Sequence, residues 1–169
     1  MEQVSVFRAT LLVAAAAVLE AVIGPYLTFG GIAPRLTLLG IVVAVSGLPE
    51  TQGLLIGFFG GVLMDALGEG LFGVGALGGL VAGAISVRVS AMKLKGAQRL
   101  IIAQAVAVSV VAYDLIHLFA THLAGLQGPS VGAFVVHGVI PDALVNAVLA
   151  YLIGLRLMKL LKVRRVRWT

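Results

Sequence analysis

The sequence predicts an all-α integral membrane protein with about six transmembrane helices. The chain of 169 residues is 60% hydrophobic and only 11% charged, whereas about a quarter of the residues in soluble domains are charged. Its apolar residues gather in six segments separated by glycine, proline and charged residues. None of these segments has the alternating pattern of a membrane β-strand. Residues 1–169 are therefore predicted to form a single transmembrane domain.

The first three apolar segments occupy the first 67 residues. Residues 6–23 form the first, which we expect to end at the Gly24-Pro25 pair. Residues 36–48 form the second and residues 54–67 the third. A full span takes about 20 residues. The second and third segments are therefore short, and a hairpin that enters the membrane and returns is the alternative to two full spans.

The last three segments are longer. They cover residues 71–87, 100–119 and 141–161. Between the last two, the glycine-rich stretch 121–137 is expected to form the longest external loop. The chain has no cysteine, which excludes disulfides and thiolate metal sites.

Basic residues predict the orientation. Cytoplasmic loops of membrane proteins are enriched in Lys and Arg. With both termini in the cytoplasm, Arg35 alone lies outside. The other eleven basic residues then lie inside: Arg8, Arg88, Lys93, Lys95, Arg99, Arg156, Lys159, Lys162, Arg164, Arg165 and Arg167.

Two glycine ladders give helix faces without side chains. Gly53, Gly57 and Gly61 lead at a spacing of four to Asp65, and a second ladder follows at once. Residues four apart share one face of a helix, and glycine faces let helices approach closely. We expect these positions to serve helix packing or to bind a partner helix: Gly53, Gly57, Gly61, Asp65, Gly73, Gly75, Gly79 and Gly83. Asp65 either caps the turn at 68–70 and pairs with Arg35, or docks a partner.

Polar residues inside the predicted membrane segments fall in the outer half. They are Glu20, Arg35, Asp114, His117, Asp142 and Asn146. The inner half offers no chain of ionisable groups, which a proton or ion pump needs. The pattern therefore favours an outward-facing cavity or docking surface over transport by this chain alone.

Each of these residues also has a local interpretation. Asp114 and His117 are three apart and could form a hydrogen-bonded pair. Asp142 follows Pro141 and suits a helix N-terminus, where the macrodipole favours an anion. Asn146 could hold two helices together.

The basic tail is the last candidate site. Lys159, Lys162, Arg164, Arg165 and Arg167 either bind anionic lipid or only determine the orientation. The sequence shows no catalytic set, phosphate loop or metal motif. We therefore expect no enzyme activity and no cofactor.

Two stretches resemble the signature of the rod shape-determining MreD family. They are residues 57–67 (GFFGGVLMDAL) and 70–77 (GLFGVGAL). They resemble the family's glycine-rich helix ending in Leu-x-x-Asp, here Val62-Leu63-Met64-Asp65, and its second element after a short turn. Residues 145–151 (VNAVLAY) before the basic end also fit, and so does the size of the whole chain.

The resemblance implies a non-enzymatic membrane scaffold for cell elongation and peptidoglycan synthesis in the bacterial inner membrane. Its implied partner is MreC, with MreB, RodA and an elongation penicillin-binding protein as indirect partners. Membrane lipids are expected to bind, a homodimer is left open, and nucleic acid is not expected. The implied fold is similar to the substrate-binding subunits of energy-coupling-factor transporters. A small-molecule-binding subunit of such a vitamin or metal transporter is therefore the alternative function.

Overall fold

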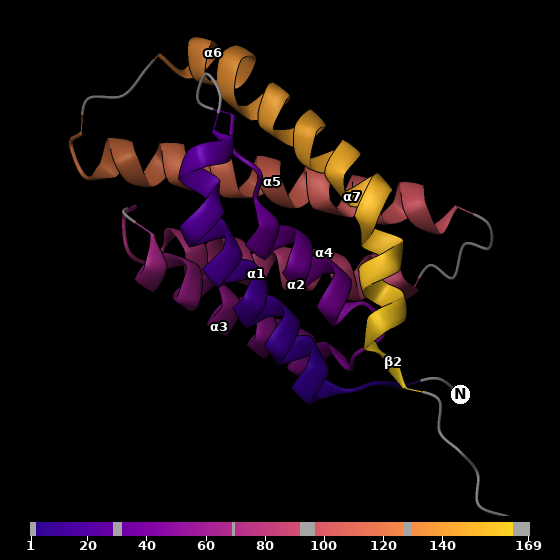
Figure 1. The fold of residues 1–169 in the computed structure, drawn as a ribbon. Helices are drawn as coiled ribbons and strands as arrows, with labels where there is room; N and C mark the ends of the chain where they lie inside the picture. The colour runs from indigo at the N-terminus through magenta and orange to yellow at the C-terminus, as the bar shows by residue number, and fades with distance from the viewer. Residues whose placement is uncertain (1–2, 29–31, 69, 92–96, 127–129, 164–169) are drawn as a thin grey trace, which may run out of the picture.

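The computed structural model describes residues 3–28, 32–68, 70–91, 97–126 and 130–163, which fold into a helical bundle (Figure 1). Its elements are β1 (Gln3–Val4), α1 (Val6–Leu27), α2 (Leu36–Val45), α3 (Glu50–Leu67), α4 (Val74–Ala91), α5 (Gln98–Leu123), α6 (Val131–Phe134), the π-helix η1 (Val135–Val139), α7 (Ile140–Leu161) and β2 (Lys162–Val163). The prediction of an all-α membrane protein is confirmed.

Several helix ends differ from the prediction. Helix α1 passes Gly24 and ends at Leu27, because Pro25 lies in its last turn and removes only one helical hydrogen bond there. Helix α3 begins at Glu50, four residues early, because the preceding proline suits a helix start. Helix α4 begins at Val74, three residues late.

The expected external loop at 121–137 is mostly helical. Helix α5 runs to Leu123, and a new helix begins at Val131. Helices α6, η1 and α7 follow one another without a break, as one continuous helix that crosses α5 and bends along α7 (Figure 1). The π-helix ends just before Pro141, which has no N–H to donate.

The number of long spans is smaller than expected. Among the described residues, three helices are long and apolar enough to cross a membrane: α1, α5 and the continuous helix Val131–Leu161. Helix α2 is apolar but has only 10 residues, and at 1.5 Å per residue it cannot cross a hydrocarbon layer of about 30 Å.

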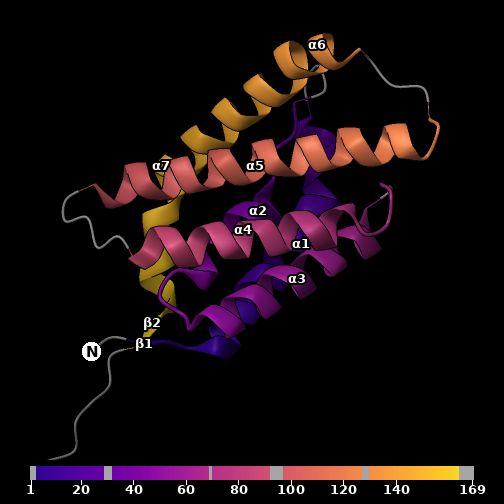
Figure 2. The ribbon, with the colours of Figure 1, turned by 180° about the vertical axis from the view of Figure 1, so that it is seen from behind.

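Helix α2 lies at the centre of the bundle (Figure 2). Every residue from Thr37 to Val45 is buried, and helices α1, α3, α4, α5 and α7 all contact it. A helix that is apolar all round belongs in a core. Its sides are consequently enclosed by the other helices of the bundle.

Helices α3 and α4 pack along the two glycine ladders, which we call the glycine seam. A methyl group added at Gly57 would meet the carbonyl oxygen of Gly79, and one added at Gly61 would meet that of Gly75. At Gly83 the added carbon would lie 2.8 Å from the carbonyl oxygen of Gly53. The two backbones therefore touch with no side chain between them.

The two ends of the described chain lie together. Strand β1 pairs antiparallel with β2, with Gln3 opposite Val163 and Val4 opposite Lys162. Close by, Arg8 Nη1 donates a hydrogen bond of 3.5 Å to the carbonyl of Leu160. We call this end of the bundle the basic end, and the opposite end, with the α1–α2, α3–α4 and α5–α6 connections, the polar end.

Candidate functional site

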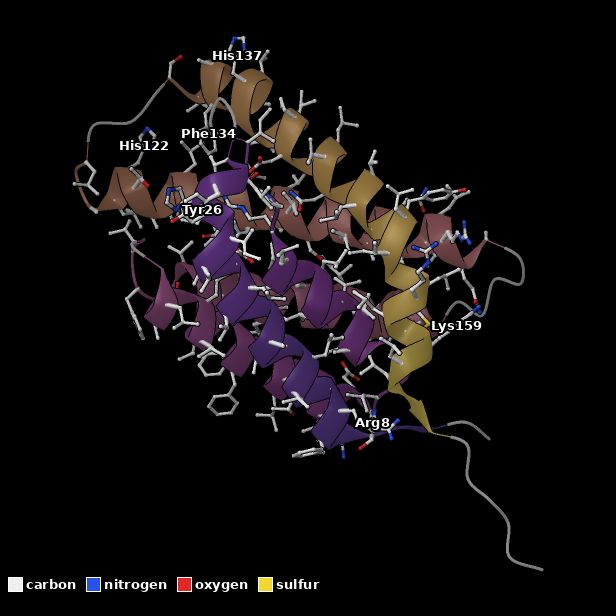
Figure 3. All side chains as sticks on the ribbon, in the orientation of Figure 1. Arg8, Tyr26, His122, Phe134, His137 and Lys159 are labelled. Carbon is white, nitrogen blue, oxygen red and sulfur yellow. The ribbon has the colours of Figure 1, made fainter. Side chains whose placement is uncertain are left out.

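The polar end contains a cavity of about 500 Å³. Helix α1, the segment 33–35, the C-terminal end of α3 and helix α5 form its walls. Tyr26 and His122 lie at the same end of the bundle, far from Arg8 and Lys159 (Figure 3). The polar residues among its lining are Glu20, Thr28, Arg35, Asp65, Tyr113 and His117.

Arg35 is the centre of the cluster around this cavity. Its Nη2 lies 3.6 Å from Asp114 Oδ1 and 3.5 Å from Asp142 Oδ2. Its guanidinium carbon also lies 4.8 Å from the ring centre of Tyr113, a cation–π distance. One guanidinium thus joins a carboxylate on α5 to another on α7.

The segment before α2 is extended, and side chains from two other helices satisfy its backbone. Asp142 accepts the N–H of Ala33 at 2.9 Å, and Asn146 accepts that of Arg35 at 2.7 Å. Asn146 also donates to the carbonyl of Ala33 at 3.1 Å.

The first turn of α2 is satisfied from α1. Glu20 accepts the N–H of Thr37 at 2.6 Å. Irregular backbone within a membrane protein is tolerated only where protein or water satisfies it. Glu20, Asp142 and Asn146 therefore hold the break before α2 in place.

Asp65 stabilises the start of α4. Its two oxygens accept the N–H groups of Gly73 at 2.9 Å, Gly75 at 2.7 Å and Ala76 at 2.9 Å. A carboxylate at a helix N-terminus satisfies free donors and interacts well with the macrodipole. Gly73 has a positive φ of 102°, which brings its N–H to the carboxylate in a turn that favours glycine.

The structure brings together five of the six predicted outer residues: Glu20, Arg35, Asp114, Asp142 and Asn146. The sixth, His117, lines the cavity from α5 and stacks on Tyr113 at 6.3 Å between ring centres. Asn146 bonds α7 to the irregular segment 33–35 rather than to a second helix.

Three interpretations of single residues are wrong. Asp65 does not pair with Arg35, whose ion pairs go to two other carboxylates. Asp114 bonds to Arg35 rather than to His117, since its side chain is directed across to the segment before α2. Asp142 is not at a free helix N-terminus, because the helix continues back to Val131.

The structure also does not leave the glycine ladders free to bind the helix of a partner protein. Each ladder faces the other across the glycine seam. A second helix cannot occupy the same face, so these glycines serve internal packing.

The basic end collects Arg8, Arg88, Arg99, Arg156 and Lys159, by their places at the ends of α1, α4, α5 and α7. Figure 3 shows Arg8 and Lys159 at this end. Lys159 is exposed, and the backbone of Lys162 belongs to β2. Lys93, Lys95, Arg164, Arg165 and Arg167 lie outside the described residues.

Sequence reasoning missed Tyr113 and the backbone at Ala33. Tyr113 precedes His117 by four residues, which places both on one face of α5, so the spacing could have revealed it. The backbone donors at Ala33 carried no sequence signal, because their partners are more than 100 positions away.

A second cavity lies on the side of the bundle. This apolar groove of about 470 Å³ runs between α1 and α3. Its walls include Ala14, Phe59, Gly60, Leu63 and Ala66. The small residues among them leave room for another apolar chain.

Comparison with known protein families identifies a match. The family model described as rod shape-determining protein MreD matches residues 1–164. No curated protein and no solved structure matches the chain. The expected likeness to the substrate-binding subunits of energy-coupling-factor transporters, and the transport function tied to it, therefore have no support.

Proposed function

Because this chain belongs to the MreD family of rod shape-determining membrane proteins, we propose that it is a non-enzymatic scaffold that binds MreC. Through MreC it would link peptidoglycan synthesis to the membrane, with MreB, RodA and an elongation penicillin-binding protein as indirect partners. The family match over residues 1–164 carries this proposal.

The hydrogen bonds that the polar side chains accept support a structural role for them. Glu20, Asp65, Asp142 and Asn146 each accept a backbone N–H. Groups engaged in this way hold segments in place, whereas a catalytic base needs access to its substrate. The described residues also contain no group of three or more metal-binding side chains.

The apolar groove between α1 and α3 is the surface that we assign to the membrane helix of MreC. The glycine seam is already filled, whereas the groove is open and apolar along two helices. Ala14, Gly60 and Ala66 line it, and small residues allow the close approach on which helix association in lipid depends.

The experiment is co-purification of MreC with this chain and with two variants. Ala14→Phe fills the groove and is expected to reduce the MreC recovered by about tenfold, a loss typical of a blocked anchor pocket. Ala15→Phe adds the same ring at the next position, which is exposed, and should leave recovery unchanged. Absence of MreC from the unaltered chain would refute the scaffold, while full recovery with Ala14→Phe would refute only the groove.

We also infer that both termini are cytoplasmic and that the chain crosses the inner membrane several times. Six described basic residues, Lys162 of β2 among them, belong to the basic end, and Arg35 belongs to the polar end. This asymmetry matches the excess of Lys and Arg in cytoplasmic loops. The cavity would then lie toward the outside of the cell.

A further inference from the structure

The basic end has an excess of positive charge. Its described basic residues are Arg8, Arg88, Arg99, Arg156, Lys159 and Lys162. Among the described residues, the only acidic side chain at this end is Glu50, at the start of α3, a helix that packs against α1, α2 and α4. Both ion pairs within the described part of the chain are made by Arg35 at the polar end. The charge of the basic end therefore favours an added anion.

A notch of about 240 Å³ lies at this end, where the start of α5 meets the middle of α7 (Figure 1). It is lined by Ala97, Gln98, Arg99, Leu100, Tyr151 and Leu155. The guanidinium carbon of Arg99 lies 5.8 Å from the ring centre of Tyr151, within the range of a cation–π interaction. This contact keeps the positive charge of Arg99 at the notch.

The start of α5 adds hydrogen-bond donors to the same place. The first N–H groups of a helix have no partner within it. Helix α5 begins after Ala97, whose methyl side chain cannot cap them. A helix N-terminus also favours negative charge. The backbone donors and Arg99 lie on one turn of α5, so they favour the same kind of ligand, for which a phosphate is suited.

Gln104 gives an independent observation that this ligand is a lipid. It is exposed, although it lies within α5, a helix long and apolar enough to cross a membrane. Gln104 is one turn beyond Leu100 on the same face of the helix, and about 7.5 Å beyond Arg99 at 1.5 Å per residue. A polar group that faces hydrocarbon is costly. The ester carbonyls of a phospholipid, which lie between its phosphate and its acyl chains, would accept the Gln104 amide.

The surface beyond the notch suits acyl chains. The face of α5 that holds Gln104 continues with Val108, which is four residues further on and exposed. The face of α7 that holds Tyr151 continues toward the polar end with Val148 and Leu144, and both are exposed. A headgroup in the notch would therefore place its acyl chains along apolar side chains of two helices.

We propose that the notch binds the phosphate of an anionic phospholipid of the phosphatidylglycerol type, with Arg99 as its cation and Gln104 at its esters. No carboxylate is among the described residues that line the notch, so the ammonium of a zwitterionic headgroup would find no counter-ion there. The site goes beyond the scaffold function and does not depend on it, because MreC is assigned to the groove between α1 and α3.

Native mass spectrometry of the full chain released from vesicles tests the proposal. The vesicles contain equal amounts of phosphatidylglycerol and phosphatidylcholine with identical acyl chains. We expect selective retention of phosphatidylglycerol. Equal retention of the two lipids, or retention of neither, would overturn the proposal. Thermal unfolding in detergent separates a lipid from a simple anion. Short-chain phosphatidylglycerol should raise Tm, and an equal rise with glycerol phosphate would refute the lipid.

Two pairs of variants locate the site. Arg99→Gln should lower the retention of phosphatidylglycerol about fivefold, as the loss of one basic residue near an anionic headgroup does. Arg88→Gln removes the same charge from an exposed position on α4 outside the notch lining and should change retention little. Ala97→Phe fills the notch and should abolish the selectivity, whereas Ala15→Phe should preserve it. Equal losses in Arg99→Gln and Arg88→Gln, or full selectivity in Ala97→Phe, would refute the notch.

Gln104→Leu distinguishes a lipid from a second copy of this chain on the same face. Because Gln104 is assigned to lipid, this variant should retain less phosphatidylglycerol while the Tm of the lipid-free protein stays unchanged. A dimer of the unaltered chain that Gln104→Leu dissociates, with lipid retention unchanged, would give this face to a second copy and overturn the proposal.

Discussion

The glycine seam and the polar cluster both join helices, but they do so by opposite means. Along the seam, α3 and α4 touch backbone to backbone, and an added methyl group would meet a carbonyl oxygen. At the cluster, α1, α5 and α7 reach the segment before α2 with hydrogen bonds and with ion pairs of 3.5 and 3.6 Å.

The two kinds of helix contact differ in how well they tolerate a gap or an added atom. Close packing loses its dispersion energy as soon as a gap opens or an atom intrudes. A polar network leaves space instead, here a cavity of about 500 Å³ and an unpartnered oxygen on Asp114. The seam is therefore suited to rigidity, and the cluster to holding an irregular segment beside a cavity.

The seam should show the larger response to a single added atom. Gly61→Ala places a methyl group on the backbone of Gly75, and we expect a loss of more than about 3 kcal/mol in the free energy of unfolding. Gly70→Ala is the matched control, because its added carbon meets nothing within 4 Å. Unfolding in detergent compares the two. A Tm for Gly61→Ala equal to that of Gly70→Ala would show that the seam is loose.

In the cluster, Asn146→Leu should have the next largest effect. It removes the acceptor of the Arg35 N–H and the donor to the Ala33 carbonyl. Since both groups lie in a half-buried segment, we expect a loss of about 2 kcal/mol. Gln104→Leu replaces an exposed amide on α5 and should change Tm little. If both substitutions have the same small effect, water replaces Asn146 and the segment before α2 is not held by it.

Asp65→Asn should have the smallest effect of the three, about 1.5 kcal/mol. The amide keeps one acceptor oxygen of the two that receive the N–H groups of Gly73, Gly75 and Ala76. Combining Asp65→Arg with Arg35→Asp should not restore stability, because the two residues do not pair. Recovery of Tm in the double variant would contradict the geometry at both places.

The sequence predicted the parts of this molecule that depend on neighbours along the chain. A spacing of four put the seam glycines on one face, and apolar runs located the helices. Because the helices alternate in direction, the sequence also predicted that the polar residues lie at one end of the bundle. It could not predict their pairings. Asp65 and Asp114 both lie late in apolar helices, and only the position of the segment before α2 decides which of them reaches Arg35.

The sequence also did not show which apolar segments are long enough to cross a membrane. The run of apolar residues at 36–48 looked like a short span, yet α2 is a ten-residue helix enclosed on all sides. Composition does not distinguish an apolar helix in lipid from one in a protein core. Likewise the glycines at 121–137 indicated a loop, while the contacts of η1 with α5 and α7 make much of that stretch helical.

The pairing of β1 with β2 brings the two ends of the described chain side by side. Residues 3 and 163 are backbone neighbours, so a short linker could join the two ends of the chain and new ends could be opened at a connection between helices. Proteins whose ends lie together tolerate such circular permutation. The two halves of a split reporter, one placed before residue 3 and one after residue 163, would then reassemble on a single molecule.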